Sequence, residues 1–477
     1  MASELAQPLQ TPLRRWLRWL PLVAILAAAI WVRWPMLPQL GYRYDTYFYQ
    51  AWTVRAVNGE GGLFAAYIMP SKSDDPEIDH PPVGVSLLAL SGKLFQDSGG
   101  DLNTKLENST NPDLVRALKI PSFIFDLLLI IAGYVIVLGE AGIGWATLVS
   151  AALAFTPGLL ADSAWWGQTD VIFTFFLVLT VYALHKRWTT AAWVFYALTM
   201  LSKFQGIPLL PLLLVLTWRR SEHRVFFRAV SISAVIFASV MLPFILGSGF
   251  SAAMRPYLEG PTKYPFVTVK AHNFWYWSLY SSRDMEAPWF KMPPDTEATW
   301  GDGIYWGPIS ARDVGYALFG LFAVLISVRA WIEHERDDEF LLATGLFAAF
   351  FMFFTQMHER YLYPALVLSI FAMVKSRWLW LLWLGFAATV TYNILTIAAH
   401  NSPPWDAIWH AMAWSSLENA RLNVILTVIL LSTILVPLYR FTRLPKLNPN
   451  TQRTLLTVGA LALVLIEIGL RLGPERQ

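Results

Sequence analysis

The stretch that decides the fold is residues 114–138, LVRALKIPSFIFDLLLIIAGYVIVL. Across 120–138 it carries a single charged side chain, Asp126. The hydrocarbon core of a bilayer is about 30 Å thick, and a helix needs about 20 apolar residues to cross it. This stretch is therefore predicted to be a membrane-spanning helix. Comparable apolar stretches recur along most of the chain.

The composition extends this prediction to all 477 residues. Hydrophobic residues make up 56% and charged residues 14% of the chain, whereas a soluble domain carries about 25% charged residues. This deficit excludes a soluble enzyme, and the apolar runs lack the alternation of β-barrel strands. The net charge of +3 gives no indication of nucleic-acid binding. The absence of cysteine excludes disulfides and thiolate metal sites.

Hydropathy, with Pro, Gly and charge clusters as boundaries, predicts an all-α polytopic membrane protein with about 13 spans in a single domain over 1–477. The first apolar segment is predicted to be an uncleaved span, because 30–35 is a poor signal-peptide cleavage site. The predicted spans are 18–36, 114–138, 145–161, 171–185, 189–202, 205–218, 226–246, 313–331, 340–355, 361–374, 378–398, 422–438 and 454–471.

Basic residues in the connections orient these spans. The segment 14–18 (RRWLR) precedes the first span, which predicts a cytoplasmic N-terminus under the positive-inside rule. Two large segments, 37–113 and 247–312, then lie outside, so any chemistry is expected on the outer face. Within the first of them, 44–58 and 80–96 are amphipathic and aromatic, which predicts helices lying in the membrane interface.

Charged residues near the spans need an explanation, because an ionised group in lipid costs several kcal/mol without a partner or a function. Asp45 follows the first span in Tyr42-Arg43-Tyr44-Asp45. It could be the N-cap of the next helix, which is a structural role. It could equally be a general base beside aromatic rings that suit a sugar face.

Two further motifs admit both a structural and a functional reading. Asp79 and His80 precede a Pro-Pro pair that starts a helix, and they are either surface polar residues or site residues. Trp166, Gln168 and Asp170 lie between two predicted spans. Belt tryptophans and a helix cap would explain this group, and so would a carbohydrate pocket.

A third set of residues suits an anion. Lys203 lies at the outer end of a predicted span, where a bound anion explains a cation better than snorkelling does. His358, Glu359 and Arg360 follow one another between two spans. They could pair as a structural latch, or Arg360 and His358 could bind a phosphate. Asn273, in a polar and aromatic part of the second outside segment, is a further candidate.

Charges inside the predicted spans have a plainer reading. Asp126 and Glu467 are expected to be helix-packing or lipid-boundary features rather than catalytic residues. Gly-x-Gly-x-x-Gly and Walker-type phosphate loops are absent from the sequence, which predicts no nucleotide site.

In their order and placement, these motifs resemble the GT-C superfamily of integral-membrane glycosyltransferases, whose donors are polyprenyl-phosphate-linked sugars. The similarity covers most of the chain and is nearest to bacterial relatives of the dolichyl-phosphate-glucose and dolichyl-phosphate-mannose transferases. The motifs that carry it are Asp45, 79–82 (Asp-His-Pro-Pro), 166–170 (Trp-Gly-Gln-Thr-Asp), 202–205 (Ser-Lys-Phe-Gln) and 358–361 (His-Glu-Arg-Tyr).

The resemblance implies a GT-C-like fold and an inverting transfer of a sugar from a polyprenyl-phosphate donor to a hydroxyl of a glycan, lipid or protein acceptor. Asp45 would be the catalytic base. The donor phosphate would be held by Lys203, Arg360 and His358. The sugar and acceptor side would be lined by Asp79, His80, Trp166, Gln168, Asp170 and Asn273.

A divalent metal ion is the one cofactor that the resemblance allows. At Asp45 the flanking residues are Tyr44 and Thr46 rather than a second carboxylate, which argues against a catalytic metal. The alternative function is a lipid-linked-sugar flippase or transporter without transferase chemistry. A transporter is expected to place its charges near mid-membrane, whereas these candidates lie at the outer ends of spans.

Overall fold

The computed structural model describes residues 16–69, 76–105, 109–260, 263–280, 294–295, 310–376, 378–398 and 403–440. Within these ranges the regular structure is helical, and β-pairing is limited to isolated bridges. The prediction of an all-α protein is therefore confirmed.

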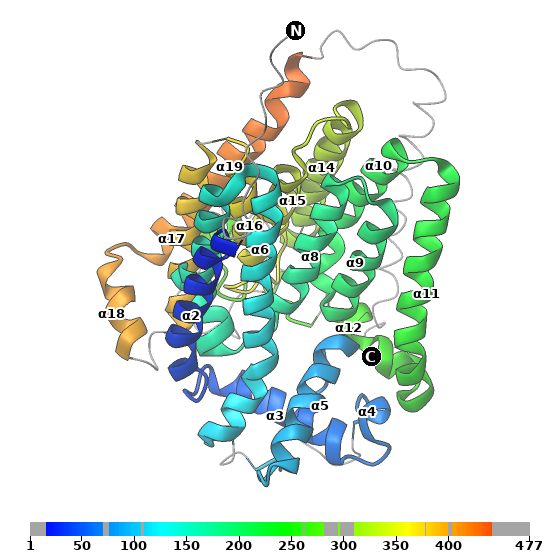
Figure 1. The fold of residues 1–477 in the computed structure, drawn as a ribbon, viewed down its shortest axis with the longest axis vertical. Helices are drawn as coiled ribbons and strands as arrows, with labels where there is room; N and C mark the ends of the chain where they lie inside the picture. Colours follow the sequence, from blue (N-terminus) through cyan, green and yellow to red (C-terminus); the bar gives the residue numbers. More distant parts are fainter. Residues whose placement is uncertain are drawn as a thin grey trace, which may run out of the picture.

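Apolar helices form the body of the molecule (Figure 1). In the described part of the chain, five are long and apolar enough to cross a membrane: α6 (Pro112–Phe155), α11 (His223–Ser248), α14 (Ala311–Ile332), α17 (Leu379–Ala398) and α19 (Ser416–Arg440). Shorter apolar helices are α2 (Leu20–Arg33), α8 (Asp170–His185), α9 (Thr189–Ser202), α15 (Glu339–Phe353) and α16 (Tyr363–Ala372). These helices are compatible with a lipid bilayer. The total of 13 spans stays a prediction, and the last predicted span, with Glu467, lies outside the described residues.

Helix α6 contains the break that the sequence predicts between 114–138 and 145–161. Gly142 has φ 82° and ψ −179°, a conformation that glycine tolerates and that divides α6 into two helices. The hydroxyl of Ser150 donates to the carbonyl of Ile130 at 3.2 Å, so the two halves lie against each other.

A group of helices lies at one end of the bundle, at the bottom of Figure 1: α3 (Arg43–Asn58), α4 (Gly62–Ala65) and α5 (Pro82–Asp97). Helices α3 and α5 match the segments predicted to be helical in the first outside segment, and they pack on each other. Their position in a membrane interface stays a prediction. The remaining short elements are η1 (Trp34–Met36), α7 (Pro157–Leu160), η3 (Ala161–Trp166), η4 (Phe204–Leu209), α10 (Leu210–Arg220), α12 (Phe250–Leu258), α13 (Phe274–Leu279) and α18 (Pro403–Ala411).

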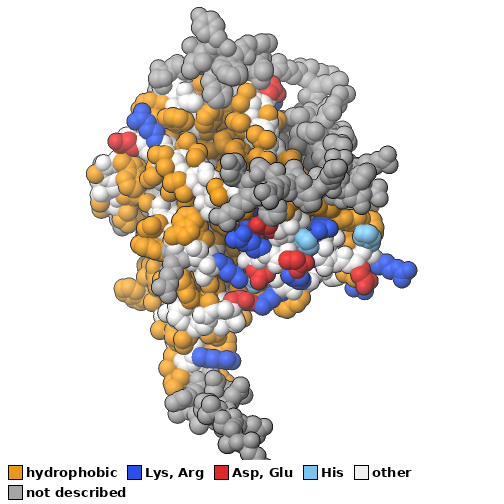
Figure 2. Space-filling model, turned by 90° about the horizontal axis from the view of Figure 1, so that it is seen from above, with side chains coloured by type: hydrophobic (Ala, Val, Ile, Leu, Met, Phe, Trp, Pro, Cys, Tyr) orange, Lys and Arg blue, Asp and Glu red, His pale blue; other side chains and the backbone are white. Residues whose placement is uncertain are grey.

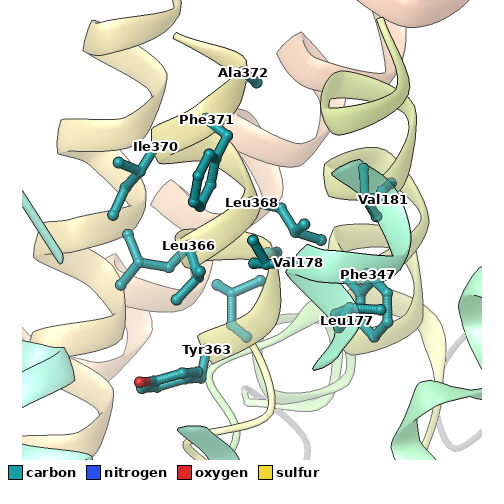
Figure 3. Close-up of a cluster of buried hydrophobic side chains, with 14 of the residues drawn as sticks. Leu177, Val178, Val181, Phe347, Tyr363, Leu366, Leu368, Ile370, Phe371 and Ala372 are labelled. Carbon is teal, nitrogen blue, oxygen red and sulfur yellow. The ribbon is translucent and has the colours of Figure 1, made fainter. Parts of the chain in front are cut away.

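The hydrophobic core is centred on α16, every residue of which is buried. Figure 3 shows Leu368 of α16 beside Val178 of α8. The rings of Phe340 and Phe371 stack at 4.8 Å between α15 and α16. Apolar side chains also face outward elsewhere: Leu246 of α11 is 78% exposed. Exposed apolar side chains of this kind are compatible with contact to lipid.

Ionic groups lie inside the bundle and at its ends. Arg33 and Asp126 form a fully buried pair with 2.6 Å between Nε and Oδ2, and Ser163 donates to the same oxygen at 2.7 Å. This contact between α2 and α6 agrees with the packing role expected for Asp126. At the end where α10 leads into α11, Figure 2 shows basic, acidic and histidine side chains gathered together.

Candidate functional site

Asp45 lies in the first turn of α3, which begins at Arg43. The N-cap residue is Tyr42, and no side chain caps the helix, so the predicted capping role of Asp45 is wrong. The Oδ2 atom of Asp45 instead accepts hydrogen bonds from the indole Nε1 of Trp166, at 2.9 Å, and from Nε2 of Gln168. Among the described residues, no cation lies within ion-pair distance of Asp45.

The two donors come from a single turn of the backbone. Trp166 ends the π-helical element η3, and Gly167 follows with φ 86°, in the left-handed region that favours glycine. The hydroxyl of Tyr49, one helical turn after Asp45, donates to Oε1 of Gln168 at 2.9 Å. This contact orients the Gln168 amide so that its NH2 group faces Asp45.

The surroundings of Asp45 make it more basic than a free aspartate. Burial raises its pKa, and the nearby Arg360 guanidinium only partly offsets this effect. Glu359 also raises the pKa, whereas His358 and the Trp166 hydrogen bond lower it. A carboxylate with a raised pKa is better suited to accept a proton.

Beside Asp45 lies a buried group of two cations and two carboxylates. Lys203 Nζ is 2.9 Å from Oδ1 of Asp170, and Arg360 Nε is 3.4 Å from Oδ2 of the same residue. Arg360 Nη1 also lies 2.5 Å from Oε1 of Glu359. Burial would raise the pKa of Glu359, but the Arg360 charge and the contact with His358 together outweigh burial and lower the pKa to about 2. The Arg360 guanidinium is 5.3 Å from the centre of the Trp166 ring, so this group adjoins the Asp45 donors.

His358 lies next to these cations. Its Nδ1 is 3.8 Å from Oε2 of Glu359, and its Nε2 has no hydrogen-bond partner in the described ranges. Burial lowers the pKa of His358, which favours a neutral imidazole. Tyr264 packs edge-on against the ring, with 4.8 Å between ring centres.

Asp79 and His80 form the other side of the site. Asp79 Oδ1 lies 2.8 Å from His80 Nδ1, and Lys263 forms an ion pair with Oδ2. The Nε2 atom of His80 lies 3.0 Å from the hydroxyl of Thr169, directly after Gln168. Burial would raise the pKa of Asp79, but the His80 hydrogen bond and the Lys263 charge outweigh it, and the pKa lies well below its usual range. Burial lowers the pKa of His80.

Asn273 serves a different local structure. Its Oδ1 accepts from the backbone N–H groups of Trp275 and Tyr276, which caps α13. Its Nδ2 donates to the carbonyls of Phe351 at 3.2 Å and Phe354 at 3.3 Å. These contacts fix α13 against the end of α15. A sugar-binding role for Asn273 stays a prediction.

Three side chains of this cluster, Tyr49, Thr169 and Lys263, were not among the candidates, and Glu359 was expected only as a partner of His358 and Arg360 in a structural latch, the pairing that is observed. Tyr49 follows Asp45 by four residues, so helical spacing could have indicated it. Glu359 lies between two candidates in sequence. Lys263 carries no local signal, because its partner Asp79 is 184 residues away.

A possible metal site lies elsewhere. In the described residues, His185, Asp337 and Glu339 have ligand atoms within 4.8 Å of one another. Glu339 is also paired with Arg220 at 2.6 Å. His185 ends α8, whereas Asp170, in the Asp45 region, begins it. No cofactor is established by this arrangement.

No family model matches the sequence, and no curated protein matches it either. The likeness to GT-C glycosyltransferases therefore stays a resemblance, carried by the sequence motifs.

Proposed function

We propose that the protein is an inverting glycosyltransferase of the GT-C type. It would move a sugar from a polyprenyl-phosphate donor to an acceptor hydroxyl at the outer face of a bacterial plasma membrane. The observation that carries the proposal is the environment of Asp45: a carboxylate with a raised pKa that accepts hydrogen bonds from two neutral donors, beside the group in which Arg360 and Lys203 pair with Asp170.

In the proposed reaction, Asp45 takes the proton of the acceptor hydroxyl while that oxygen attacks the anomeric carbon. The attack comes from the face opposite the phosphate, so the new bond forms as the bond to the phosphate oxygen breaks. The released polyprenyl phosphate keeps the bonding electrons. Because a phosphate is a good leaving group, the step needs little general-acid assistance, in contrast to glycoside hydrolysis.

The donor phosphate would lie against Lys203 and Arg360. Lys203 is buried and the Arg360 side chain is 12% exposed, and electrostatic stabilisation of a developing charge is strongest where water is excluded. Asp170 and Glu359 neutralise them before the donor arrives. The unpartnered Nε2 of His358 could hydrogen-bond a phosphate oxygen.

The sugar and acceptor would occupy the space around Trp166. An indole face packs well on the C–H face of a sugar ring. The polar side chains proposed for this part of the site are Asp79, His80, Gln168 and Asp170. The acceptor would be a glycan, lipid or protein hydroxyl, and no step of the proposed reaction requires a metal ion.

The test compares Asp45→Asn with Asp97→Asn, a matched change at an exposed residue of α5. Each protein is reconstituted in liposomes with synthetic polyprenyl-phosphate hexoses as donors. A glycolipid extract from the cells that express the protein supplies the acceptor. Released polyprenyl phosphate is quantified by mass spectrometry, and the anomeric form of the product by NMR. We expect Asp45→Asn to lose about 10²- to 10⁴-fold in rate and Asp97→Asn to behave as wild type.

Near-normal turnover by a folded Asp45→Asn variant would refute the assignment of the base. A lipid-linked-sugar flippase would move the intact donor across the bilayer and release no polyprenyl phosphate. The same assay on the wild-type protein therefore separates the two functions.

A further inference from the structure

Helix α6 holds the backbone of the turn that carries the two Asp45 donors. Lys119 and Ser122 lie one helical turn apart on the same face of α6. The Lys119 ammonium donates to the carbonyl of Trp165 and, at 2.7 Å, to that of Gln39. The hydroxyl of Ser122 donates to the carbonyl of Gln168 at 2.8 Å.

The position of Lys119 is costly. Its side chain is 3% exposed, and no carboxylate of the described chain lies within ion-pair distance of its ammonium. A buried ammonium without a counter-ion loses its hydration, which disfavours burial strongly unless other groups replace the water. Here carbonyl oxygens replace that hydration, and a third one, from Met36 at 3.5 Å, ends η1. The ammonium thus joins two separate segments: the chain that leads to Asp45, and η3.

The segment before Asp45 and the turn at 165–168 are closely packed against each other and against Lys119. A Cβ atom on Gly41 would lie 2.8 Å from the Cα of Trp166. A Cβ atom on Gly167 would lie 2.5 Å from Cγ of Lys119. The chain before Asp45, the turn with its donors and the Lys119 side chain are therefore in direct contact.

We propose that Lys119 is a positioning residue, which holds the turn at 165–168 so that the Trp166 indole and the Gln168 amide both reach Oδ2 of Asp45. Its catalytic consequence rests on the function proposed above, whereas the geometric claim does not. Ser122 supports the same turn through a single neutral hydrogen bond and is expected to contribute less.

Loss of Lys119 has a defined effect on the base. If the turn relaxes, Asp45 loses hydrogen bonds that favour its charged form, so its pKa rises. The other groups that act on Asp45 are Arg360, Glu359 and His358 from the segment before α16, Tyr264, and Tyr42 and Tyr49 from its own segment. None of them is a hydrogen-bond partner of Lys119, which donates to backbone carbonyls.

The experiment measures the ionisation of Asp45 directly, with the full chain in detergent. Infrared spectra are recorded as a function of pH, and the Asp45 carboxyl signal is isolated by subtracting Asp45→Asn spectra. In Lys119→Met we expect the Asp45 midpoint to move to higher pH by about one unit, a tenfold change in its ionisation constant. Lys119→Arg, which keeps the charge and the donors, should restore part of the shift. Lys93→Met, at an exposed lysine of α5, should leave the midpoint unchanged.

An unchanged midpoint in a folded Lys119→Met variant would overturn the proposal. Should Lys119→Met fail to fold, Ser122→Ala decides: a smaller rise supports the proposal, and no rise overturns it. Because the readout is spectroscopic, it does not depend on sugar transfer. A shifted midpoint in a protein that transfers no sugar would refute the proposed function alone, and an unshifted midpoint in an active transferase would refute the positioning role alone.

Discussion

The two ends of α8 carry ionic clusters of different character. At its last residue, His185 lies between Glu339, at 3.1 Å, and Glu140, at 3.4 Å, while Arg220 and Lys186 pair with the same two glutamates. At its first residue, Asp170 is paired in the same way with cations, but the neighbouring Asp45 is held by an indole and an amide. Carboxylates matched to cations lock helices together. A carboxylate held by neutral donors remains able to accept a proton.

The largest expected effect concerns stability at the His185 end. Both side chains of the Arg220–Glu339 pair are at most 3% exposed. Arg220→Met therefore leaves Glu339 buried, with His185 as its remaining ion-pair partner among the described residues. We expect the free energy of unfolding to fall by about 3 kcal/mol, with transfer per folded molecule unchanged. Thermal unfolding in detergent measures the loss. The matched change Lys93→Met breaks an exposed pair and should cost less than about 1 kcal/mol. Equal losses of unfolding free energy in both variants would contradict a larger stabilising role for the buried pair than for the exposed one.

At the Asp170 end, the expected loss is in transfer. Lys203→Met removes one of the two cations proposed to bind the donor phosphate, while Arg360 remains 3.4 Å from Asp170 and limits the cost in stability. Transfer should fall about 10²- to 10³-fold. Steady-state kinetics at several donor concentrations, together with thermal unfolding, would separate the two effects. If Lys203→Met is destabilised as much as Arg220→Met but transfers sugar normally, Lys203 stabilises the fold and does not bind the donor phosphate.

Acid should weaken the Asp79 region in a predictable direction. The pKa of Asp79 is lower in the folded protein than in the unfolded chain, so its ionised form adds stability above the unfolded value near pH 4. That contribution is lost as the pH falls further. Thermal unfolding between about pH 3 and pH 6 should therefore show a shallower acid slope in Asp79→Asn than in the wild type. Asp113→Asn, at an exposed residue, provides the comparison, and equal slopes in all three proteins would contradict the assignment.

The sequence allowed the fold class to be predicted because apolar runs and their breaks are local signals. Gly142, for example, divides α6 within the predicted gap between 114–138 and 145–161. It also placed Asp45, Trp166 and Lys203 among the candidates, since polar groups beside apolar spans are conspicuous. It could not show that Trp166 and Asp45 touch, because they are 121 residues apart. Nor could it distinguish a cap from a hydrogen-bonded carboxylate at Asp45, since that choice depends on where α3 begins.

The positioning of Lys119 was beyond sequence reasoning for a related reason. A lysine near the start of an apolar run looks like an interfacial residue that extends towards water. The structure instead turns it inward to carbonyls that are 46 and 80 residues away. Contacts with backbone atoms leave no residue-type signal in the partner segment, so they cannot be read from a pattern of side chains.

The Arg33–Asp126 pair also bears on how the protein is made. Helix α2 is synthesised 93 residues before the carboxylate that neutralises its arginine. Until Asp126 has been synthesised, α2 is a helix of only 14 residues that carries an unpaired arginine. Both its short length and its unpaired charge disfavour insertion into lipid. Under the predicted topology, its stable insertion should therefore wait for α6, so that the first two apolar helices insert together. Asp126→Leu would leave Arg33 without its carboxylate partner. We expect the variant protein to be degraded in the cell and to reach a lower level than the wild type.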